Sequence, residues 1–506
     1  MAGQLGATRR EAVVGGGDDD QDVDPDGDTP KEACGVIGVY APGQPVSHLI
    51  YLGLYALQHR GQESAGIAVS DGVTLEATAG MGLVSDVFNE DTLNRLARAG
   101  TAGAIGHNRY STAGGSKACN VQPLLQSFVG GQVAVGHNGN LINAEAHRRE
   151  FEDAGHIFHT TSDTEVIVHL LASPAQQSQA DPIAATLRRL QGAFSLVLLF
   201  PDRLEAARDP WGWRPLVLGK IEEGGKTYFV VASETVALHV VGATFLREVE
   251  PGEIITINAK GMTSRRFTDR SSQPAHCAFE HVYFASPASQ IFGQNVQRVR
   301  ELLGEALSRE APVDADFVMP MPDSGRSAAN GYARASGLPY REGIVPNRYV
   351  GRTFIKPTQE ARRAAVRLKL NVVEEIVRGQ RVVVVDDSVV RGTTTREKMI
   401  QIREAGAKEI HLRISCPPIR HPCHFGVDFA TRDQLIAAER SVEEIREFLG
   451  VDSLHYLSLE GMLGCMQHKA EHYCSACWTG QYRLDPDKPE TGPISEAGQL
   501  KIFAEK

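Results

Sequence analysis

Two adjacent acids stand at the end of a strongly apolar run, where they could hold a sugar hydroxyl or a Mg²⁺ ion. The run is four valines, Val382 to Val385, which is typical of a strand buried on both faces of a parallel sheet. Asp386 and Asp387 follow it, and open α/β sheets bind their ligands at that end of their strands. The loop after them contains Ser388, Arg391, Gly392, Thr393 and Thr394. Because hydroxyl side chains and free N–H groups at the start of a helix bind phosphate, this stretch predicts a site for a phosphorylated sugar.

A cysteine opens the first apolar segment of the chain. Cys34 follows a glycine-rich, acidic stretch and begins the sequence CGVIGVY, which is typical of a strand. A small core residue is one explanation for a cysteine in this place. The other is catalytic, because a thiol at the N-terminus of a processed chain is a nucleophile whose own α-amine can act as the base. The position alone favours neither explanation.

The remaining cysteines could form a metal site. Cys474 and Cys477 form a C-x-x-C pair, which indicates a metal or cluster site when two further thiolates meet it. Spacing alone does not choose among Zn²⁺, a [4Fe–4S] cluster, a redox pair and plain burial. The residues that could join or rival the pair are Cys119, Cys277, Cys416, Cys423, Cys465, His468 and His472.

The chain has the length and composition of a multidomain globular protein. It has 506 residues, 42% of them hydrophobic and 23% charged, and this length indicates roughly two to four domains. The formal net charge of −10 argues against a nucleic-acid partner, which would require a basic surface. The sequence contains no apolar run of about 18 residues and no apolar secretory signal, so we expect a cytoplasmic protein without a membrane partner.

Changes in composition divide the chain into parts. Residues 1–33 are acidic and rich in glycine, and we expect a disordered leader because they cannot bury enough surface to offset the entropy of ordering. We expect a first domain over residues 34–260 and a second over residues 277–480, joined by the polar connection of residues 260–276. Residues 481–506 are expected to form a C-terminal tail.

Three segments are expected to position the candidate residues. The pattern REKMIQIREAGA, after the hydroxyl-rich loop, predicts a helix that a glycine ends. The segment DFVMPMPDSGRSAANGYARASG predicts a strand, a loop and a helix, with Ser324 after the strand. That serine could bind Mg²⁺ through its oxygen or only cap the helix. The segment REVEPGEIITI predicts a closing hairpin of the first domain.

Four ordered motifs characterise the first domain: QHRGQESAG, GHNRYST, GHNGNLIN and TSDTEV. Together with the Cys-Gly start, they resemble the motifs of class II glutamine amidotransferases. The resemblance implies a four-layer αββα sandwich of the N-terminal nucleophile hydrolase type, in which two sheets lie between helices. It also implies that Cys34 becomes N-terminal when the leader is removed and then attacks glutamine.

The same resemblance assigns roles to residues within the motifs. Arg109 would bind the α-carboxylate of glutamine with its planar guanidinium, and Asp163 would pair with the α-ammonium. Asn138 and Gly139 would donate a side-chain and a backbone N–H to the oxyanion of the tetrahedral intermediate. Simpler explanations are a surface ion pair for Arg109 and a type I′ hairpin turn for the Asn-Gly pair. Two further residues of the motifs have no firm role, Arg60 and Tyr110.

The stretch RVVVVDDSVVRGTT resembles the signature with which type I phosphoribosyltransferases bind phosphoribosyl pyrophosphate (PRPP). The resemblance implies a parallel sheet in the second domain and a Mg²⁺ ion bound by Ser324, Asp386 and Asp387. It assigns PRPP binding to Asp386, Asp387, Ser388, Arg391, Gly392, Thr393 and Thr394. The portion YVGRTF resembles the mobile loop that closes over PRPP in amidophosphoribosyltransferases, and Arg352 is its cation.

The chain from Cys34 to about Gly480 resembles the amidophosphoribosyltransferase family as a whole. Membership implies that ammonia from glutamine passes to C1 of PRPP, releasing pyrophosphate and glutamate and forming 5-phosphoribosylamine, the first committed step of de novo purine biosynthesis. The leader and the cysteines further resemble the branch with a leader peptide and a structural [4Fe–4S] cluster. The implied cluster ligands are Cys277, Cys423, Cys474 and Cys477. The family also implies one Mg²⁺ per subunit, a homotetramer and feedback inhibition by purine nucleotides.

Two other classes of protein share parts of this pattern. Another class II amidotransferase, such as a hexosamine-phosphate or asparagine synthase, would share the first domain, but the PRPP-like stretch counts against it. A non-enzymatic PRPP-sensing regulator would share the second domain. Cys34 with its glutamine-binding residues counts against that regulator, and so does the lack of a basic DNA-binding segment.

Overall fold

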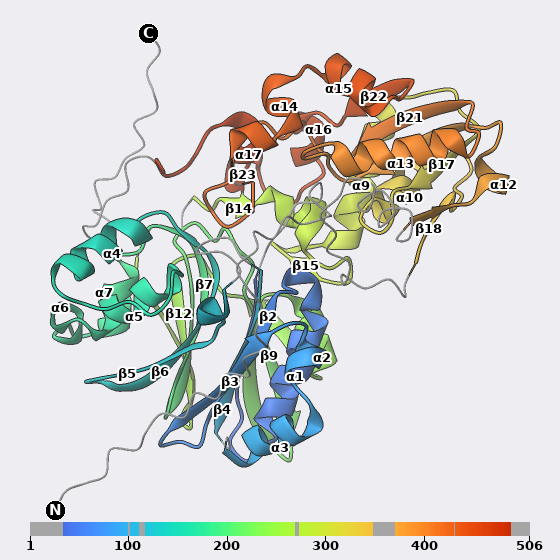
Figure 1. Ribbon diagram of the computed structural model, residues 1–506. Coiled ribbons are helices and arrows are strands. Elements are labelled where there is room, and N and C mark those ends of the chain that lie inside the picture. Colours follow the sequence, from blue (N-terminus) through green and yellow to red (C-terminus); the bar gives the residue numbers. More distant parts are fainter. Residues whose placement is uncertain are drawn as a thin grey trace, which may run out of the picture.

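The computed structural model describes residues 34–99, 102–110, 117–268, 273–347, 370–429 and 431–486. The expected leader, Arg352 and most of the expected tail lie outside the described residues. The described chain forms two lobes, one coloured blue to green and the other yellow to red (Figure 1).

Two antiparallel sheets form the first lobe. The strands of one are β1 (Gly35–Tyr40), β2 (Ser64–Ser70), β3 (Leu75–Met81), β4 (Gly103–Arg109), β9 (Val217–Glu223), β10 (Lys226–Ala232) and β11 (Thr244–Glu248). The strands of the other are β5 (Leu124–Phe128), β6 (Gly131–Leu141), β7 (Gly192–Phe200), β8 (Arg203–Arg208), β12 (Glu253–Asn258) and β13 (Gly261–Arg266). Their orders are β11-β9-β10-β1-β4-β2-β3 and β13-β12-β8-β7-β6-β5. The two sheets share one buried apolar cluster, in which Ile105 of the first meets residues such as Val197 of the second.

Helices cover the outer faces of both sheets, which gives the lobe four layers (Figure 1). The seven-stranded sheet is covered by α1 (Val46–Ala56), α3 (Glu90–Ala99) and α8 (Thr235–Val240). The six-stranded sheet is covered by α4 (Ala144–Asp153), α5 (Thr164–Ala172) and α7 (Pro182–Leu187). Shorter helical segments are α2 (Val84–Val87), α6 (Pro174–Gln177), η1 (Gln58–Arg60) and η2 (Ala118–Asn120). The predicted αββα sandwich is confirmed.

Two expectations about the end of this lobe need correction. The expected hairpin is wrong, because β11 pairs with β9 in one sheet while β12 pairs with β8 in the other. Between them, Val249 is fully buried in the core between the sheets, so the chain crosses from one layer to the next instead of turning back. The expected polar connection begins with β13, an edge strand on which Thr263, Ser264 and Arg266 are exposed, so the sheet continues past residue 260.

A parallel four-stranded sheet organises the second lobe, as predicted. Its strands are β17 (Phe317–Pro320), β20 (Arg381–Asp386), β21 (Glu409–Ile414) and β22 (Ser453–Tyr456), in the order β17-β20-β21-β22. The longer helices of the lobe are α9 (Val296–Glu310), α10 (Arg326–Ser336), α13 (Thr393–Glu404) and α15 (Val442–Leu449). The valines of β20 are fully buried between these layers. The predicted helix after the hydroxyl-rich loop is α13, and Gly406 follows its end with a φ of +93°.

Short elements complete the second lobe and its contact with the first. The helical ones are α12 (Glu374–Val377), α14 (Ile436–Glu439), α16 (Leu459–Leu463), α17 (Ala476–Thr479), η5 (Arg432–Gln434), η6 (Ala470–His472) and the π-helix η4 (Glu280–Phe284). The short strands are β14 (His276–Cys277), β15 (Gln290–Ile291), β16 (Gln294–Asn295), β18 (Ile344–Pro346), β19 (Leu370–Val372) and β23 (Tyr473–Cys474). The β14–β23 pair lies between the lobes (Figure 1), where Cys277 N–H donates to the carbonyl oxygen of Trp213. Tyr482, from the expected tail, donates its hydroxyl to Pro422 in the same region.

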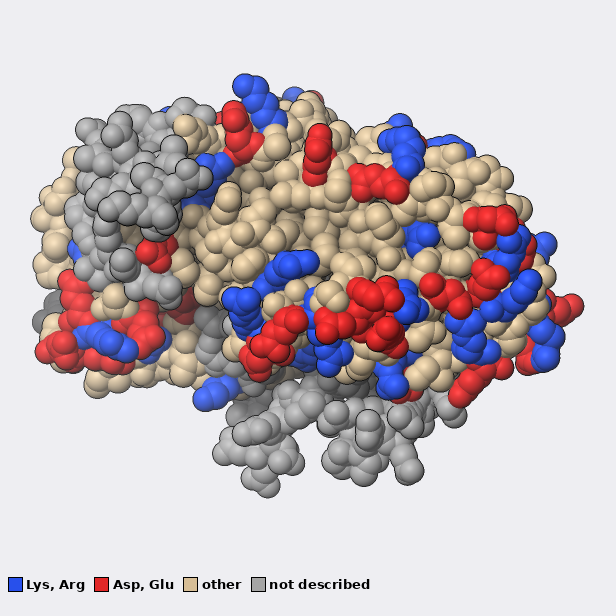
Figure 2. Space-filling model, turned by 90° about the horizontal axis from the view of Figure 1, so that it is seen from above, with Lys and Arg blue, Asp and Glu red and all other residues tan. Residues whose placement is uncertain are grey.

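The distribution of charged side chains and the lengths of the helices complete the description of the fold. On the face shown in Figure 2, acidic and basic side chains are interspersed, so this face does not present the basic stripe that nucleic acids require. Within the described ranges, no helix combines the length and the apolar character needed to cross a membrane.

Candidate active sites

Cys34 stands directly before β1 and is buried, with 6% of its surface exposed. In the antiparallel pair of β1 and β4, Gly35 lies opposite Asn108, so the register continues to put Cys34 across from Arg109. The thiol donates to the carbonyl oxygen of Tyr110 over 3.6 Å. Arg109 is itself buried, which excludes the surface ion pair considered for it. The sheet therefore brings the predicted nucleophile next to the predicted carboxylate-binding arginine.

Asn138 and Gly139 lie within strand β6 and pair with β7. The hairpin turn considered for this pair is wrong, because the strand continues to Leu141. Gly139 has a φ of +145°, and a Cβ in its place would lie 2.0 Å from the carbonyl oxygen of Ala193, so only glycine fits. The buried amide nitrogen Nδ2 of Asn138 has no hydrogen-bond partner among the described residues. A free buried donor is costly unless a ligand uses it, so this amide suits an oxyanion.

A histidine joins the sheet of Cys34 to the strand of Asn138. His107 Nε2 on β4 lies 3.0 Å from the carbonyl oxygen of His137 on β6. Burial lowers the pKa of His107 to about 3, with a smaller effect in the same direction from Arg109. The ring is therefore neutral at pH 7 and donates one hydrogen bond across the gap between the sheets.

Asp163 directly precedes α5 and lines a cavity of about 390 Å³. Its carboxylate accepts a hydrogen bond of 3.0 Å from the N–H of Leu141. Burial would raise its pKa, but the neighbouring His137 and the N–H of Leu141 outweigh burial and hold the pKa of Asp163 below its usual value. The ionised carboxylate can therefore pair with an ammonium group in the cavity. The cavity is lined by Asn140, Leu141, Ile142, Ala144, Glu145, Arg148, Thr161, Asp163, His424 and Pro486.

The two acids of the second lobe lie at the C-terminal end of β20, near the middle of the parallel sheet. Asp386, Asp387 and Ser388 are all buried, and the Ser388 hydroxyl donates to Asp387 over 2.7 Å. Burial raises the pKa of Asp386 well above its usual value, and the negative charge of Asp387 raises it further. Two mutually repelling carboxylates in such a place are stabilised by a bound cation.

The predicted phosphate loop connects these acids to α13. Gly392 precedes the helix with a φ of +78°, and Thr393 is the first helical residue. Thr394 lies in the same first turn, while the Arg391 guanidinium bonds to the side chain of Gln434. Hydroxyl side chains thus lie in the first turn of a long helix that begins directly after the loop of the two acids, as a phosphate site requires.

Ser324 reaches the same end of the sheet from a neighbouring strand. It is half-buried in the loop that follows β17. Met321 N–H in this loop donates to the carbonyl oxygen of Val385, and a Cβ on Gly325 would lie 2.3 Å from that same oxygen. The loop therefore lies against the end of β20 that carries the two acids.

Four cysteines converge where the lobes meet. Cys277 on β14 lies opposite Cys474 on β23 in a parallel pair. The N–H groups of Arg420 and His421 both donate to the carbonyl oxygen of Cys477 over 3.0 Å, which ties the segment of Cys423 to the C-x-x-C pair. Burial, opposed by Arg214 and reinforced by Glu280, Cys474 and Cys423, raises the pKa of the Cys277 thiol to about 12.

The rival ligands have other contacts. The Cys465 thiol donates to the carbonyl oxygen of Gly461, and the ring of His468 packs 5.4 Å from that of His276. His468 in turn lies 6.4 Å from His472, centroid to centroid. In the part of the chain that the structure describes, no three His, Cys, Asp or Glu side chains gather closely enough to hold a single metal ion.

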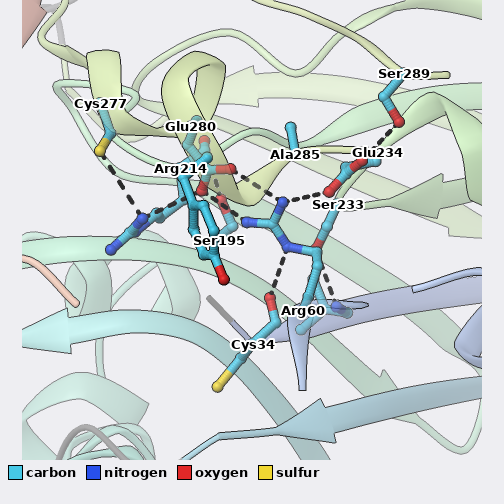
Figure 3. A network of polar contacts seen from close by, with 12 residues as sticks. Cys34, Arg60, Ser195, Arg214, Ser233, Glu234, Cys277, Glu280, Ala285 and Ser289 are labelled. Atoms are coloured by element: carbon cyan, nitrogen blue, oxygen red, sulfur yellow. Dashed lines mark hydrogen bonds and ion pairs between the residues drawn. The ribbon is translucent and has the colours of Figure 1, made fainter. Parts of the chain in front are cut away.

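Sequence reasoning missed two residues behind Cys34. Glu280 and Arg214 are fully buried and joined by a hydrogen bond of 3.1 Å, and Glu280 also binds Arg60 (Figure 3). Arg60 in turn donates to the carbonyl oxygen of Cys34 over 3.2 Å. Arg60 stands inside a motif, but nothing in the pattern around Glu280 indicates a partner 220 residues earlier in the chain.

Comparisons with known proteins agree with this arrangement. The model of a glutamine amidotransferase domain family matches residues 107–240. The amidophosphoribosyltransferase of Synechococcus elongatus is 47% identical over 459 residues, which cover 90% of this chain and 92% of the relative. The amidophosphoribosyltransferase of Bacillus subtilis is 47% identical over 457 residues, 89% of this chain and 94% of that protein.

Two solved structures resemble about nine tenths of the chain. One, described as the allosteric regulatory enzyme of purine biosynthesis, has a TM-score of 0.83 at 45% identity and covers 91% of this chain and 98% of its own. The other is the glutamine PRPP amidotransferase of B. subtilis complexed with ADP and GMP, with a TM-score of 0.82 at 45% identity and coverage of 90% and 98%.

The fold and the two sites define a glutamine amidotransferase lobe joined to a phosphoribosyltransferase lobe. The chain belongs to the amidophosphoribosyltransferase family. It is therefore an enzyme, a pentosyltransferase that uses glutamine in purine biosynthesis, as the motifs predicted.

Proposed function

We propose that the first lobe hydrolyses glutamine at Cys34 and that the second lobe joins the released ammonia to C1 of PRPP. The observation that carries this proposal is the buried amide of Asn138, which has no hydrogen-bond partner among the described residues and lies on the strand that His107 ties to the sheet of Cys34. Such a donor suits an oxygen that becomes charged when the nucleophile attacks. Asp386 and Asp387 support the second half, because buried carboxylates at a strand end suit a ribose and its cation.

Five residues would carry out the hydrolysis of glutamine. The Cys34 thiol gives its proton to the α-amine of the same residue and attacks the carboxamide carbon, while Asn138 and Gly139 donate to the resulting oxyanion. Ammonia leaves with that proton, and water then hydrolyses the thioester to glutamate. Arg109 and Asp163 hold the α-carboxylate and α-ammonium, so the carboxamide is oriented before attack.

A free α-amine on Cys34 requires that residues 1–33 be removed. The amine can act as the base only when it is not part of a peptide bond. The acidic and glycine-rich composition of these residues supports a propeptide.

The transfer half depends on the strand end of β20. Asp386, Asp387 and Ser324 would hold Mg²⁺, which neutralises charge on the leaving pyrophosphate when bound. Asp387 and Ser388 would hold the ribose hydroxyls. Arg391, Gly392, Thr393 and Thr394 would hold the 5′-phosphate, and Arg352 would close over PRPP. The chain's own contribution is to orient C1 and to exclude water from it.

The four converging cysteines fit a [4Fe–4S] cluster. Within the described residues Cys277 lies opposite Cys474, and the segment of Cys423 is bonded to the C-x-x-C pair. The four thiols of Cys277, Cys423, Cys474 and Cys477 therefore lie in one region, and the family resemblance supports a cluster there in place of Zn²⁺. The cluster would supply a structural link between β14, β23 and the segment of Cys423.

Regulation and assembly complete the proposal. The B. subtilis relative was solved with ADP and GMP, so we propose feedback inhibition of this enzyme by purine nucleotides. From the family resemblance we also propose a homotetramer located in the cytoplasm.

The test uses the purified full-length chain with glutamine, PRPP and Mg²⁺. We expect glutamate, pyrophosphate and 5-phosphoribosylamine in equal amounts, together with a mature N-terminal residue, Cys34, in mass spectra of the active enzyme. Glutamate formed without pyrophosphate at saturating PRPP would contradict the transfer half, and an active enzyme with an uncleaved chain would contradict the role of the α-amine.

A further inference from the structure

A network of buried charges joins the two lobes directly behind Cys34 (Figure 3). Arg60 Nε donates to the carbonyl oxygen of Cys34 over 3.2 Å. The other two nitrogens of this guanidinium donate to the two carboxylate oxygens of Glu280, over 2.6 and 3.0 Å. The bidentate geometry fixes the plane of the guanidinium, so the position of Glu280 in the second lobe sets the position of the Cys34 carbonyl in the first.

Glu280 holds a second arginine of the first lobe. Arg214 Nη1 donates to Glu280 over 3.1 Å, and Nη2 of the same guanidinium donates to the carbonyl oxygen of Phe425 over 3.0 Å. The segment of Phe425 lies against the predicted oxyanion residue, because a Cβ on Gly426 would lie 3.2 Å from the Cα of Gly139. Glu280 is therefore connected to the nucleophile through Arg60 and to the oxyanion residue through Arg214.

The network contains equal numbers of arginine and glutamate side chains, and all of these side chains are buried. Arg60 also pairs with Glu234, whose other oxygen accepts from the Ser289 hydroxyl over 2.6 Å. His59 Nε2 lies 2.9 Å from Glu234. Two guanidinium groups thus face two carboxylates, each with 1% or less of its side chain exposed. Desolvation makes such buried pairs weak contributors to stability, whereas their fixed geometry constrains position.

We propose that Glu280 is a positioning residue for the glutamine reaction: through Arg60 it fixes the backbone of Cys34, and through Arg214 it fixes the segment that supports Gly139. The inference rests on the proposed roles of Cys34 and Gly139. Glu280 lies at the start of the π-helix η4, three residues after Cys277, so a residue of the second lobe completes the site of the first. A small displacement of a nucleophile relative to its substrate lowers the rate of attack by about 100-fold.

The test compares Glu280→Gln with wild type in two assays on the full-length enzyme. Glu280→Gln keeps the shape of the side chain but removes the charge that orients both arginines. We expect kcat with glutamine to fall by about 100-fold, while KM for glutamine and the activity with ammonium salt stay within about threefold. This split separates positioning from unfolding, because a chain that fails to fold would lose both activities.

Glu253→Gln is the matched control. Glu253 is also buried and forms a bidentate pair with an arginine, Arg247, over 2.7 and 2.8 Å, but it lies on β12 outside the network. We expect both activities of this variant to stay within about twofold of wild type. A second readout is the pH dependence of Cys34 alkylation by a glutamine-analogue diazoketone, which should slow and shift in Glu280→Gln but not in Glu253→Gln.

Three outcomes separate the possibilities. An unchanged kcat with glutamine in Glu280→Gln would overturn the inference while leaving the role of Cys34 intact. Retained glutamine activity in Cys34→Ala would instead overturn the proposed function. If Glu280→Gln loses both activities, the Arg214→Lys variant is tested next. This change keeps the positive charge but removes the planar guanidinium that joins Glu280 to Phe425. Arg214→Lys should show the same split, and normal glutamine turnover in that variant would overturn the inference.

Discussion

The side-chain amide of Asn140 donates a hydrogen bond of 2.9 Å to the carbonyl oxygen of His424, a residue 284 positions later in the chain. Asn140 stands next to Gly139 on β6, and both Asn140 and His424 line the cavity of Asp163. His424 in turn follows Cys423 directly. One wall of the cavity beside Asp163 is therefore supplied by the phosphoribosyltransferase lobe, and the contact joins the segment that follows Cys423 to the strand of Gly139.

Cys34→Ala should separate the two reactions. We expect glutamine-dependent synthesis of phosphoribosylamine to be abolished, because the nucleophile is gone, while synthesis from added ammonium salt continues at the untouched strand end of β20. The measurement is product formation with either nitrogen source at saturating PRPP. Loss of the ammonium-dependent reaction in a folded variant would show that the assignment of two sites is wrong.

Asp387→Asn should impair both reactions. The change removes one charge from the proposed ribose and cation site, where a charge-assisted contact is worth roughly 1.5 to 3 kcal/mol, or a loss on the order of 10- to 150-fold in rate. Asp316→Asn is a suitable control, because Asp316 pairs with Arg381 at the opposite end of β20. Activity with ammonium and with glutamine should be measured across a Mg²⁺ titration. Equal losses in both variants would point to a general effect on folding.

Removal of the proposed cluster should destabilise the region between the lobes. Protein purified without oxygen should contain about four irons and four sulfides per chain, and Cys477→Ser should lose them together with thermal stability, because binding energy at such a site is also folding energy. Cys119→Ser is the control, since Cys119 is an exposed cysteine. Colourless, active protein that contains zinc would overturn the prediction.

Much of the second lobe could be predicted from local pattern. The valine run, the two acids and the helical pattern after them are continuous in sequence, and the structure has them as β20, its C-terminal end and α13. Periodicity and burial were sufficient here because the strand is buried on both faces. The position of Ser324 after a strand was predicted from the same kind of pattern, whereas its nearness to the two acids was implied only by the resemblance to type I phosphoribosyltransferases.

Features that depend on distant pairing were not predictable in this way. The Asn-Gly pair at residue 138 has the composition of a turn, yet its strand continues because Gly139 tolerates a positive φ against Ala193. The strands around Val249 look like a hairpin, but a buried side chain between two sheets directs them apart. The pairing of Arg60 with Glu280 joins two lobes, and a single sequence contains no local signal for it.

His107 should make the folded enzyme less stable in mild acid, at pH values above those at which carboxylates are usually protonated. The ring is fully buried, and burial lowers its pKa in the folded chain to about 3. The unfolded chain binds a proton at this residue below about pH 6.5, which the folded chain does not bind until about pH 3. The protonation of this residue therefore leaves the free energy of unfolding unchanged above pH 6.5. As the pH falls from 6.5 towards 3, it lowers the free energy of unfolding by about 1.4 kcal/mol per pH unit.

His107→Gln removes this titration while keeping a side-chain amide that can donate towards the carbonyl oxygen of His137. We will measure the free energy of unfolding by urea titration at a series of pH values. Between pH 6.5 and 3, its slope against pH should correspond to about one proton fewer taken up on unfolding in the variant than in wild type. His147→Gln is the control, because His147 is buried too but bonds to Glu150 at the surface. The same slope in His107→Gln and wild type would mean that the ring is protonated in the folded enzyme, and the hydrogen bond between the two sheets would then involve a charged donor.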